Sequence, residues 1–93
     1  MRNRALIFVT QYQKELGQIR NFTQRSYSQW AVDEIRRLIF KADKDQSITK
    51  LVWDFARMAD DLSVSNSKQR LMWSVAYDVA VDILDHLTVS DYM

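Results

Sequence analysis

The sequence has no cysteine, no proline and only one glycine in its 93 residues. Without cysteine the chain cannot form a disulfide, a zinc–thiolate site or a thiol nucleophile, which suits a reducing compartment. Strands joined by hairpins need turn residues, and these are nearly missing. A chain without proline also lacks the commonest helix breaker. The composition therefore predicts an all-α protein.

Long apolar runs are missing as well. No run of 18 apolar residues is present, so we expect no membrane-spanning helix and no membrane partner. The stretch ALIFV near the start is followed at once by TQYQK, which makes it too short for a signal peptide. We therefore predict a cytoplasmic protein.

The charges are distributed unevenly along the chain. Residues 1–41 contain eight Lys or Arg and three acidic residues, whereas 42–93 contain five Lys or Arg and nine Asp, which gives +5 and −4. One interpretation is that a basic half packs against an acidic half within one fold. The other is that the basic end of the molecule meets an acidic protein or a nucleic acid.

Apolar residues recur every three or four positions in four stretches, and this spacing predicts four helical segments. Polar stretches separate them: NFTQRSYS, DKDQS and SVSNS. Ser, Asn and Asp in such stretches favour helix caps and turns. We expect Phe22, in the first stretch, to fold back onto the core. The predicted helices are 3–20, 29–42, 48–62 and 68–87, and the predicted N-caps are Ser26 or Ser28, Ser47 or Asp45, and Asn66 or Ser67.

Short connections of this kind join helices that lie antiparallel. We therefore predict a compact bundle of four helical segments, mostly antiparallel, in a single domain over 1–93. The last residues, 88–93, follow the final apolar position and are predicted to form a frayed tail.

The last predicted helix contains LMWSVAYDVAVDILDHL, whose apolar residues do not keep to one side. At about 100° per residue they cover roughly three quarters of the circumference, and Ser74, Asp78, Asp82 and Asp85 form the polar strip. An amphipathic surface helix needs an apolar stripe only somewhat wider than about 100°. Either this helix is central and the other three pack around it, or another chain covers part of it.

The second predicted helix has large aromatic residues outside its apolar face. Trp30 and Phe40 lie on the far side and flank Arg37, and such residues are enriched at protein interfaces. The alternative is that the 21–28 connection folds over Trp30. The partner would be another protein or a second copy of the chain, giving a homodimer. The predicted contact surface is Trp30, Arg37 and Phe40, with Tyr77 and Val81 on the apolar flank of the last helix.

Residues for catalysis or metal binding are sparse. A single His and a single Gly disfavour a Ser-His-acid triad and the Gly-rich phosphate loops. Asp78, Asp82 and His86 share one helix stripe, where Asp and His can bind a metal, but a solvated strip is the simpler interpretation. The stretch 43–54 matches part of a calcium loop, yet Ile48 stands where the loop needs Gly. We predict no enzyme, no cofactor and no metal.

These observations favour a small non-enzymatic protein, an adaptor or regulator, that acts through protein–protein interaction. The first alternative is a nucleic-acid-associated regulator that uses the basic N-terminal half. It is disfavoured because no basic second helix follows a short turn, as in a helix-turn-helix. The second alternative is an immunity or antitoxin-type helical bundle, which the size and helicity allow.

Overall fold

The computed structural model describes residues 2–43 and 45–91. None of these residues lies in a strand, which confirms the all-α prediction. The elements are α1 (Arg2–Leu16), α2 (Phe22–Lys41), α3 (Ile48–Ser65), the short 3₁₀ helix η1 (Ser67–Gln69) and α4 (Arg70–Asp91). None of these helices is both long and apolar enough to cross a bilayer.

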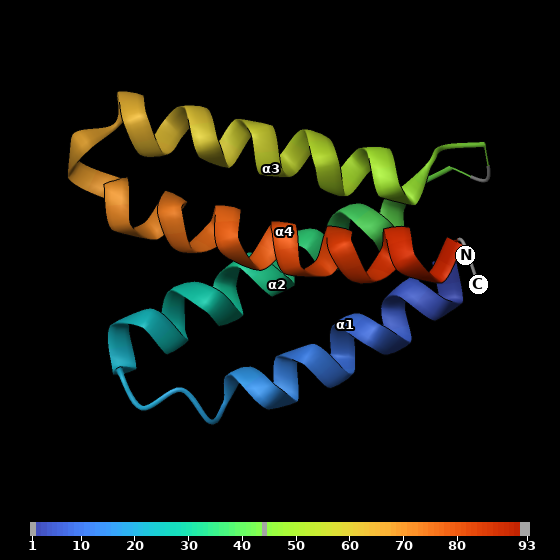
Figure 1. Cartoon of the computed structure of the whole chain (residues 1–93), viewed down its shortest axis with the longest axis horizontal. Helices are drawn as coiled ribbons and strands as arrows, with labels where there is room; N and C mark the ends of the chain where they lie inside the picture. The colour runs from blue at the N-terminus through green and yellow to red at the C-terminus, as the bar shows by residue number, and fades with distance from the viewer. Residues whose placement is uncertain (1, 44, 92–93) are drawn as a thin grey trace.

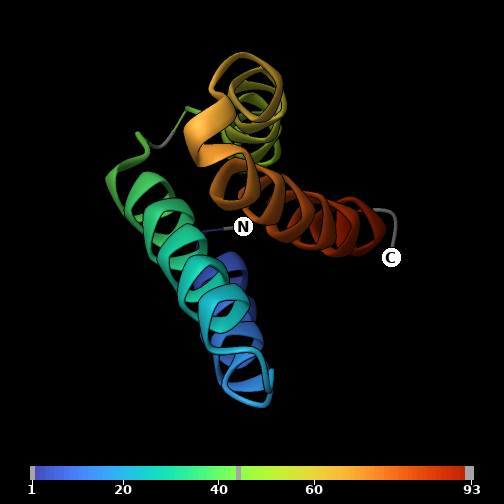
Figure 2. The same ribbon diagram turned by 90° about the vertical axis from the view of Figure 1, so that its left-hand side faces the viewer.

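The four helices form two antiparallel hairpins, α1–α2 and α3–α4 (Figure 1). The view in Figure 2 shows the two hairpins inclined to each other, with α4 directed away from the tip of the α1–α2 hairpin. Helix α4 packs most extensively against α3 and then against α2. It reaches α1 through side chains, including a hydrogen bond and a ring stack.

The first two helices have different bounds from those predicted. Helix α1 ends at Leu16, and α2 begins at Phe22, well before residue 29. Asn21 caps α2: its backbone is extended, and its side chain accepts a hydrogen bond from the Gln24 N–H at 2.9 Å. The prediction failed because the polar stretch at 21–28 resembles a connection, although its polar residues are compatible with helix once a cap precedes them.

Two expectations about this stretch are therefore wrong. Ser26 and Ser28 do not cap α2, since both lie inside the helix, and Ser28 is buried. Phe22 does not fold back onto the core, because it is 71% exposed. The guanidinium carbon of Arg25 instead lies 5.5 Å from the centroid of its ring.

The last two helices are longer than predicted. Ser47 caps α3 as expected, accepting a hydrogen bond from the Lys50 N–H at 3.2 Å. Helix α3 continues to Ser65, and its Ser63 hydroxyl donates to the Asp60 carbonyl, which keeps the serine satisfied within the helix. Helix α4 continues to Asp91, so the helix includes 88–91 of the predicted frayed tail. Residues 92–93 lie outside the described residues.

A continuous apolar core lies between the hairpins, and α4 is its central helix. One apolar face of α3 is buried along its length, and four buried alanines lie on α3 and α4. The wide apolar arc of α4 is thus covered mainly by the other three helices of the same chain. Exposed apolar area remains at Leu71 (58%) and Tyr77 (37%). The core residues of the last two helices include Ile48, Val52, Phe55, Ala56, Ala59, Val75, Ala76, Val79, Ala80, Ile83 and Leu87.

Candidate interaction surface

The structure does not gather the five predicted contact residues into one surface. Trp30 does not face away from the core: it is half-buried and packs edge to face on Trp73 of α4, with ring centroids 5.3 Å apart and an interplanar angle of 74°. The helix-wheel argument failed here because α2 packs against α1 on one side and against α4 on another. A wheel drawn for one helix assumes a single inner face.

Phe40 and Arg37 do lie together, at the edge of a groove between α1 and α2. The groove has a volume of about 450 Å³. Phe40 is 71% exposed, and the Arg37 side chain is 60% exposed. We call this feature the α1–α2 groove; it is lined by Leu6, Thr10, Asp33, Arg36, Arg37 and Phe40.

Hydrogen bonds join α1 to α2 beside this groove. Gln13 on α1 donates through Nε2 to Asp33 Oδ1 at 3.0 Å, and its Oε1 accepts from Arg36 Nη2. Arg36 Nη1 also donates to Asp33 Oδ1 at 3.0 Å. These contacts hold the charge of Arg36 in place between the helices.

Arg37 is held much less firmly than Arg36. Its Nη1 lies 3.3 Å from Glu34 Oε1 on the preceding turn of the same helix, and the Arg37 side chain is largely exposed. Exposed ion pairs of this kind contribute about 0–1 kcal/mol. Arg37 can therefore exchange Glu34 for an acidic group of a partner at little cost.

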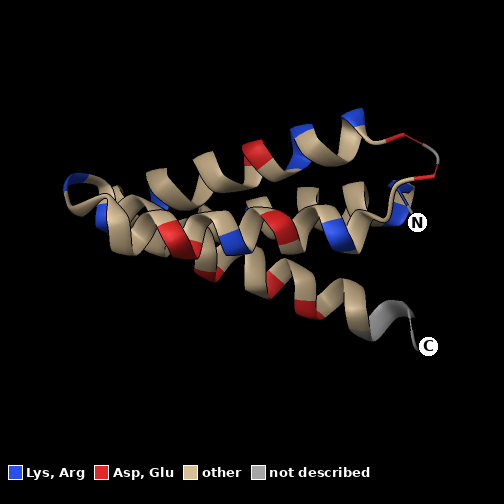
Figure 3. Cartoon of the chain, turned by 90° about the horizontal axis from the view of Figure 1, so that it is seen from above, with Lys and Arg blue, Asp and Glu red and all other residues tan. Residues whose placement is uncertain are grey.

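Charges of both signs lie at the end of the molecule where this groove lies. In Figure 3 the basic residues in the last turns of α2 and at the start of α1 lie at the same end as the acidic residues of the loop that follows α2. Both ion pairs formed among residues 2–43 and 45–91 lie within α2. The two hairpins therefore pack through apolar and hydrogen-bonded contacts. Both arginines of the groove are paired within α2, and Arg37 is the more exposed of the two.

Tyr77 and Val81 lie on α4 and do not line the groove. Tyr77 is 37% exposed, and Val81 is half-buried. They are part of the apolar circumference that α4 needs as the central helix. Of the five predicted contact residues, only Arg37 and Phe40 line the groove. Leu6 and Thr10 of α1 also line it and were not predicted.

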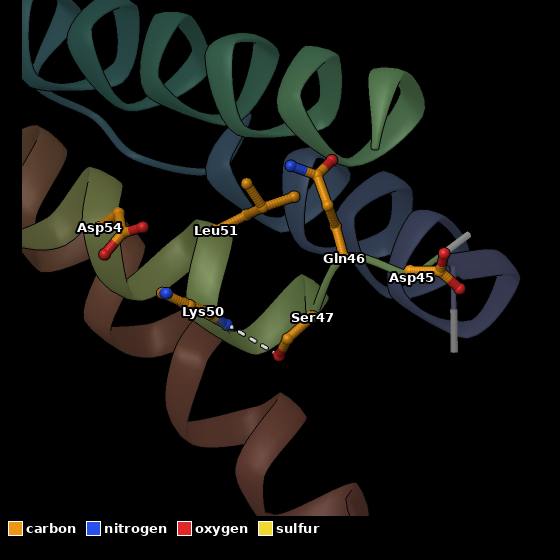
Figure 4. Close-up of a pocket in the computed structure, with 6 residues that line it drawn as sticks. All are labelled: Asp45, Gln46, Ser47, Lys50, Leu51 and Asp54. Carbon is orange, nitrogen blue, oxygen red and sulfur yellow. Dashed lines mark hydrogen bonds between the residues drawn. The ribbon is translucent and has the colours of Figure 1, made fainter. Parts of the chain in front are cut away.

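A second depression, of about 420 Å³, lies where the chain enters α3 (Figure 4). It includes Asp45 and Asp54 from the stretch that resembles part of a calcium loop. Figure 4 shows these two carboxylates at opposite ends of the depression, with the Ser47 cap between them. No group of three potential metal-binding side chains occurs in the described part of the chain. The Ser47 that lines this depression is the N-cap of α3.

The α1–α2 groove therefore combines an exposed aromatic ring, an adaptable arginine and an apolar wall, and it offers no catalytic constellation. Comparison with known proteins adds no family: no family model matches the chain, and no curated protein or solved structure is significantly similar to it.

Proposed function

We propose that this protein is a small non-enzymatic adaptor or regulator that binds a partner protein through the α1–α2 groove. The exposure of Phe40 beside Arg37 carries the proposal. A phenylalanine that is 71% exposed contributes little apolar burial to the folded state. Burial of its ring on binding is favourable. Aromatic rings and arginine also supply most of the binding energy in many interfaces.

The shape and charge of the groove favour an amphipathic helix with acidic side chains as the occupant. A groove between two helices accepts the apolar face of a third helix. Leu6 and Phe40 would contact that face, and Arg37 would meet the acidic side chains. Complementary charge of this kind speeds association and selects the partner.

The chain offers a matched pair of variants for testing this surface. Phe40 and Phe22 are both on α2 and are both 71% exposed, but only Phe40 lines the groove. Affinity capture from the native cell would use the wild type, Phe40→Ser and Phe22→Ser, with helicity checked by circular dichroism. We expect Phe40→Ser to weaken partner binding by about 30-fold or more, the loss typical of an interface hot spot, and Phe22→Ser to retain it. Equal recovery with both variants would contradict the proposal.

A second copy of the chain is the other occupant to test, as a homodimer. Light scattering coupled to size exclusion, from low to high micromolar concentration, measures self-association directly. A dimer lost in Phe40→Ser and kept in Phe22→Ser would identify the second copy as the occupant. A wild type that stays monomeric at high micromolar concentration would exclude the second copy as the occupant.

The excess of lysine and arginine in residues 1–41 supports a second candidate function, association with nucleic acid. Some of these residues, from α1 and α2, lie at one end of the molecule (Figure 3), and phosphate contacts by such residues dominate non-specific affinity. A gel-shift assay at 50 mM salt with duplex DNA and single-stranded RNA tests it. Binding that disappears in Arg37→Glu and falls steeply with salt would favour this function, and no shift at 50 mM salt would exclude it.

A further inference from the structure

A smaller cleft lies on the other side of α1, where the C-terminal half of α1, the first turns of α2 and the middle of α4 meet. Its volume is about 160 Å³. Its wall combines apolar side chains with oxygen-bearing ones and contains no Lys, Arg or His. We call it the acidic cleft; it is lined by Tyr12, Leu16, Ile19, Gln24, Ser28, Val75, Asp78, Val79 and Asp82.

Among the described residues, no Lys, Arg or His forms an ion pair with the carboxylates of the acidic cleft. Asp78 and Asp82 are one turn apart on α4, and both ion pairs of the described residues lie elsewhere, within α2. The Tyr12 hydroxyl donates to Asp82 Oδ2 at 2.9 Å. Burial first, and then this hydrogen bond and the nearby carboxylates, raise the pKa of Tyr12. The phenol is thus fixed as a neutral donor to Asp82, and its oxygen can still accept a hydrogen bond.

Ser28 supplies an independent sign that the cleft is built for a ligand. It is 3% exposed and is the one buried polar side chain among the described residues. It lines the cleft, and its hydroxyl makes no hydrogen bond to another described residue. The oxygen itself is not fully buried, because the one fully buried polar side-chain atom without a partner among the described residues is Trp73 Nε1. The hydroxyl is therefore open to the cleft, where a hydrogen-bond donor can reach it.

We propose that the acidic cleft binds a primary alkylammonium group, presented by a free alkylamine or by a lysine side chain. An ammonium has three N–H donors, and Asp78, Ser28 and the Tyr12–Asp82 pair supply acceptors for them. Leu16, Ile19, Val75 and Val79 contact the alkyl chain. A cavity of about 150 Å³ holds a ligand the size of benzene, which matches the five heavy atoms of a butylammonium ion.

The composition of the cleft favours an organic cation over a metal ion or an anion. A hard metal ion needs more oxygen ligands than two neighbouring carboxylates provide, and no group of three potential metal ligands occurs among the described residues. The two carboxylates also disfavour anions. This site is separate from the α1–α2 groove, so failure of one proposal leaves the other standing.

The test titrates the ¹⁵N-labelled full chain with n-butylammonium chloride at neutral pH and follows backbone amide shifts. We expect saturable shifts at residues 12, 28, 78 and 82, with a dissociation constant in the millimolar range, as suits about five ligand heavy atoms. Uncharged 1-butanol should bind at least about tenfold more weakly, because it lacks the charge that the carboxylates attract. Absence of saturable shifts, or equal binding of 1-butanol, would overturn the proposal.

Matched variants separate a specific site from general attraction to an acidic protein. Asp78→Asn keeps the size of the side chain and should weaken butylammonium binding about tenfold or more. Asp85→Asn removes the same charge from the same helix but does not line the cleft, so it should change binding less than twofold. Equal losses of butylammonium affinity in the two variants would show only non-specific attraction and would contradict the proposed site.

The source of the ammonium group is resolved by a second ligand pair. Nα-acetyl-lysine N-methylamide and Nα-acetyl-norleucine N-methylamide differ only in the terminal ammonium. Tighter binding of the lysine derivative than of butylammonium would indicate a partner's lysine, and the reverse order would indicate a free amine. Binding of the norleucine derivative as tight as that of the lysine derivative would overturn the proposal.

Discussion

Helix α4 contacts α3 on one side and α1 on the other, and these contacts are built from different kinds of residue. Buried alanines lie on both α3 and α4, and these two helices pack more extensively than any other pair. The contact with α1 uses large rings instead: Tyr12 bonds to Asp82, and Phe8 stacks on His86 with centroids 3.6 Å apart and planes 4° apart.

Side-chain size sets the distance between helices in this bundle and thereby separates a tightly packed contact from a more open one. Small residues let two backbones approach and leave no room between them, so that contact mainly stabilises the fold. Large rings hold α1 farther from α4, and the acidic cleft lies beside them. The α1 side of α4 is therefore where polar groups and a ligand can be accommodated.

The largest expected effect comes from removing the apolar packing of α4. Ile83 is fully buried, so Ile83→Ala should lower the free energy of unfolding by about 2–5 kcal/mol. Val64→Ala on α3 is the control, since Val64 is 75% exposed and its truncation should cost less than about 0.5 kcal/mol. Urea denaturation measures both, and similar losses would contradict the central position of α4.

A smaller effect is expected from the hydrogen bond between α1 and α4. Tyr12→Phe removes only the hydroxyl that donates to Asp82, and it should cost about 0.5–1.5 kcal/mol. A double-mutant cycle with Asp82→Ala measures the coupling between the two side chains. Additive losses from the two single substitutions would show that this bond does not hold α1 to α4.

The ring stack on the same side should contribute less. Phe8→Leu keeps an apolar side chain but removes the stack on His86, and we expect a loss of about 0.5 kcal/mol, since the stack is partly exposed. The same substitution in a His86→Ala background should cost less. An equal loss in both backgrounds would assign the effect to the apolar contacts of Phe8 alone.

The response to pH is confined to alkaline solution, with none from Tyr12 below about pH 10. The pKa of Tyr12 is higher in the folded chain than the usual value of 10.0, because burial and Asp82 disfavour the phenolate. The stabilisation that this provides is complete below pH 10 and is lost as the pH rises toward the folded-state pKa. Urea titrations from pH 9 to 11 should show a steeper loss of stability in wild type than in Tyr12→Phe, and parallel curves would exclude the effect.

Local patterns predicted much of the fold. The apolar spacing of α3 located its buried face, and Ser47 was a recognisable cap. The start of α2 was missed because polar residues at 21–28 can form either a connection or the exposed side of a helix. Asn21 was the cap signal, yet nothing in the local sequence made it preferable to Ser26 or Ser28.

The candidate sites were predicted less well, because they depend on contacts between distant parts of the chain. The sequence marked Arg37 and Phe40 correctly as exposed, but it placed Trp30 with them although Trp73 covers it. Asp78 and Asp82 were visible as a polar strip. Tyr12 lies 70 residues away from Asp82 along the chain, so their hydrogen bond could not be read from a helical wheel.

The order of the helices also affects how the chain is made. Helix α4 has 22 residues and follows the three helices that pack around it. At a synthesis rate of roughly 5–20 residues per second, the ribosome needs about 1–4 s to add it. Until α4 has been added, the apolar faces of α1, α2 and α3 lack the helix that buries them in the finished fold.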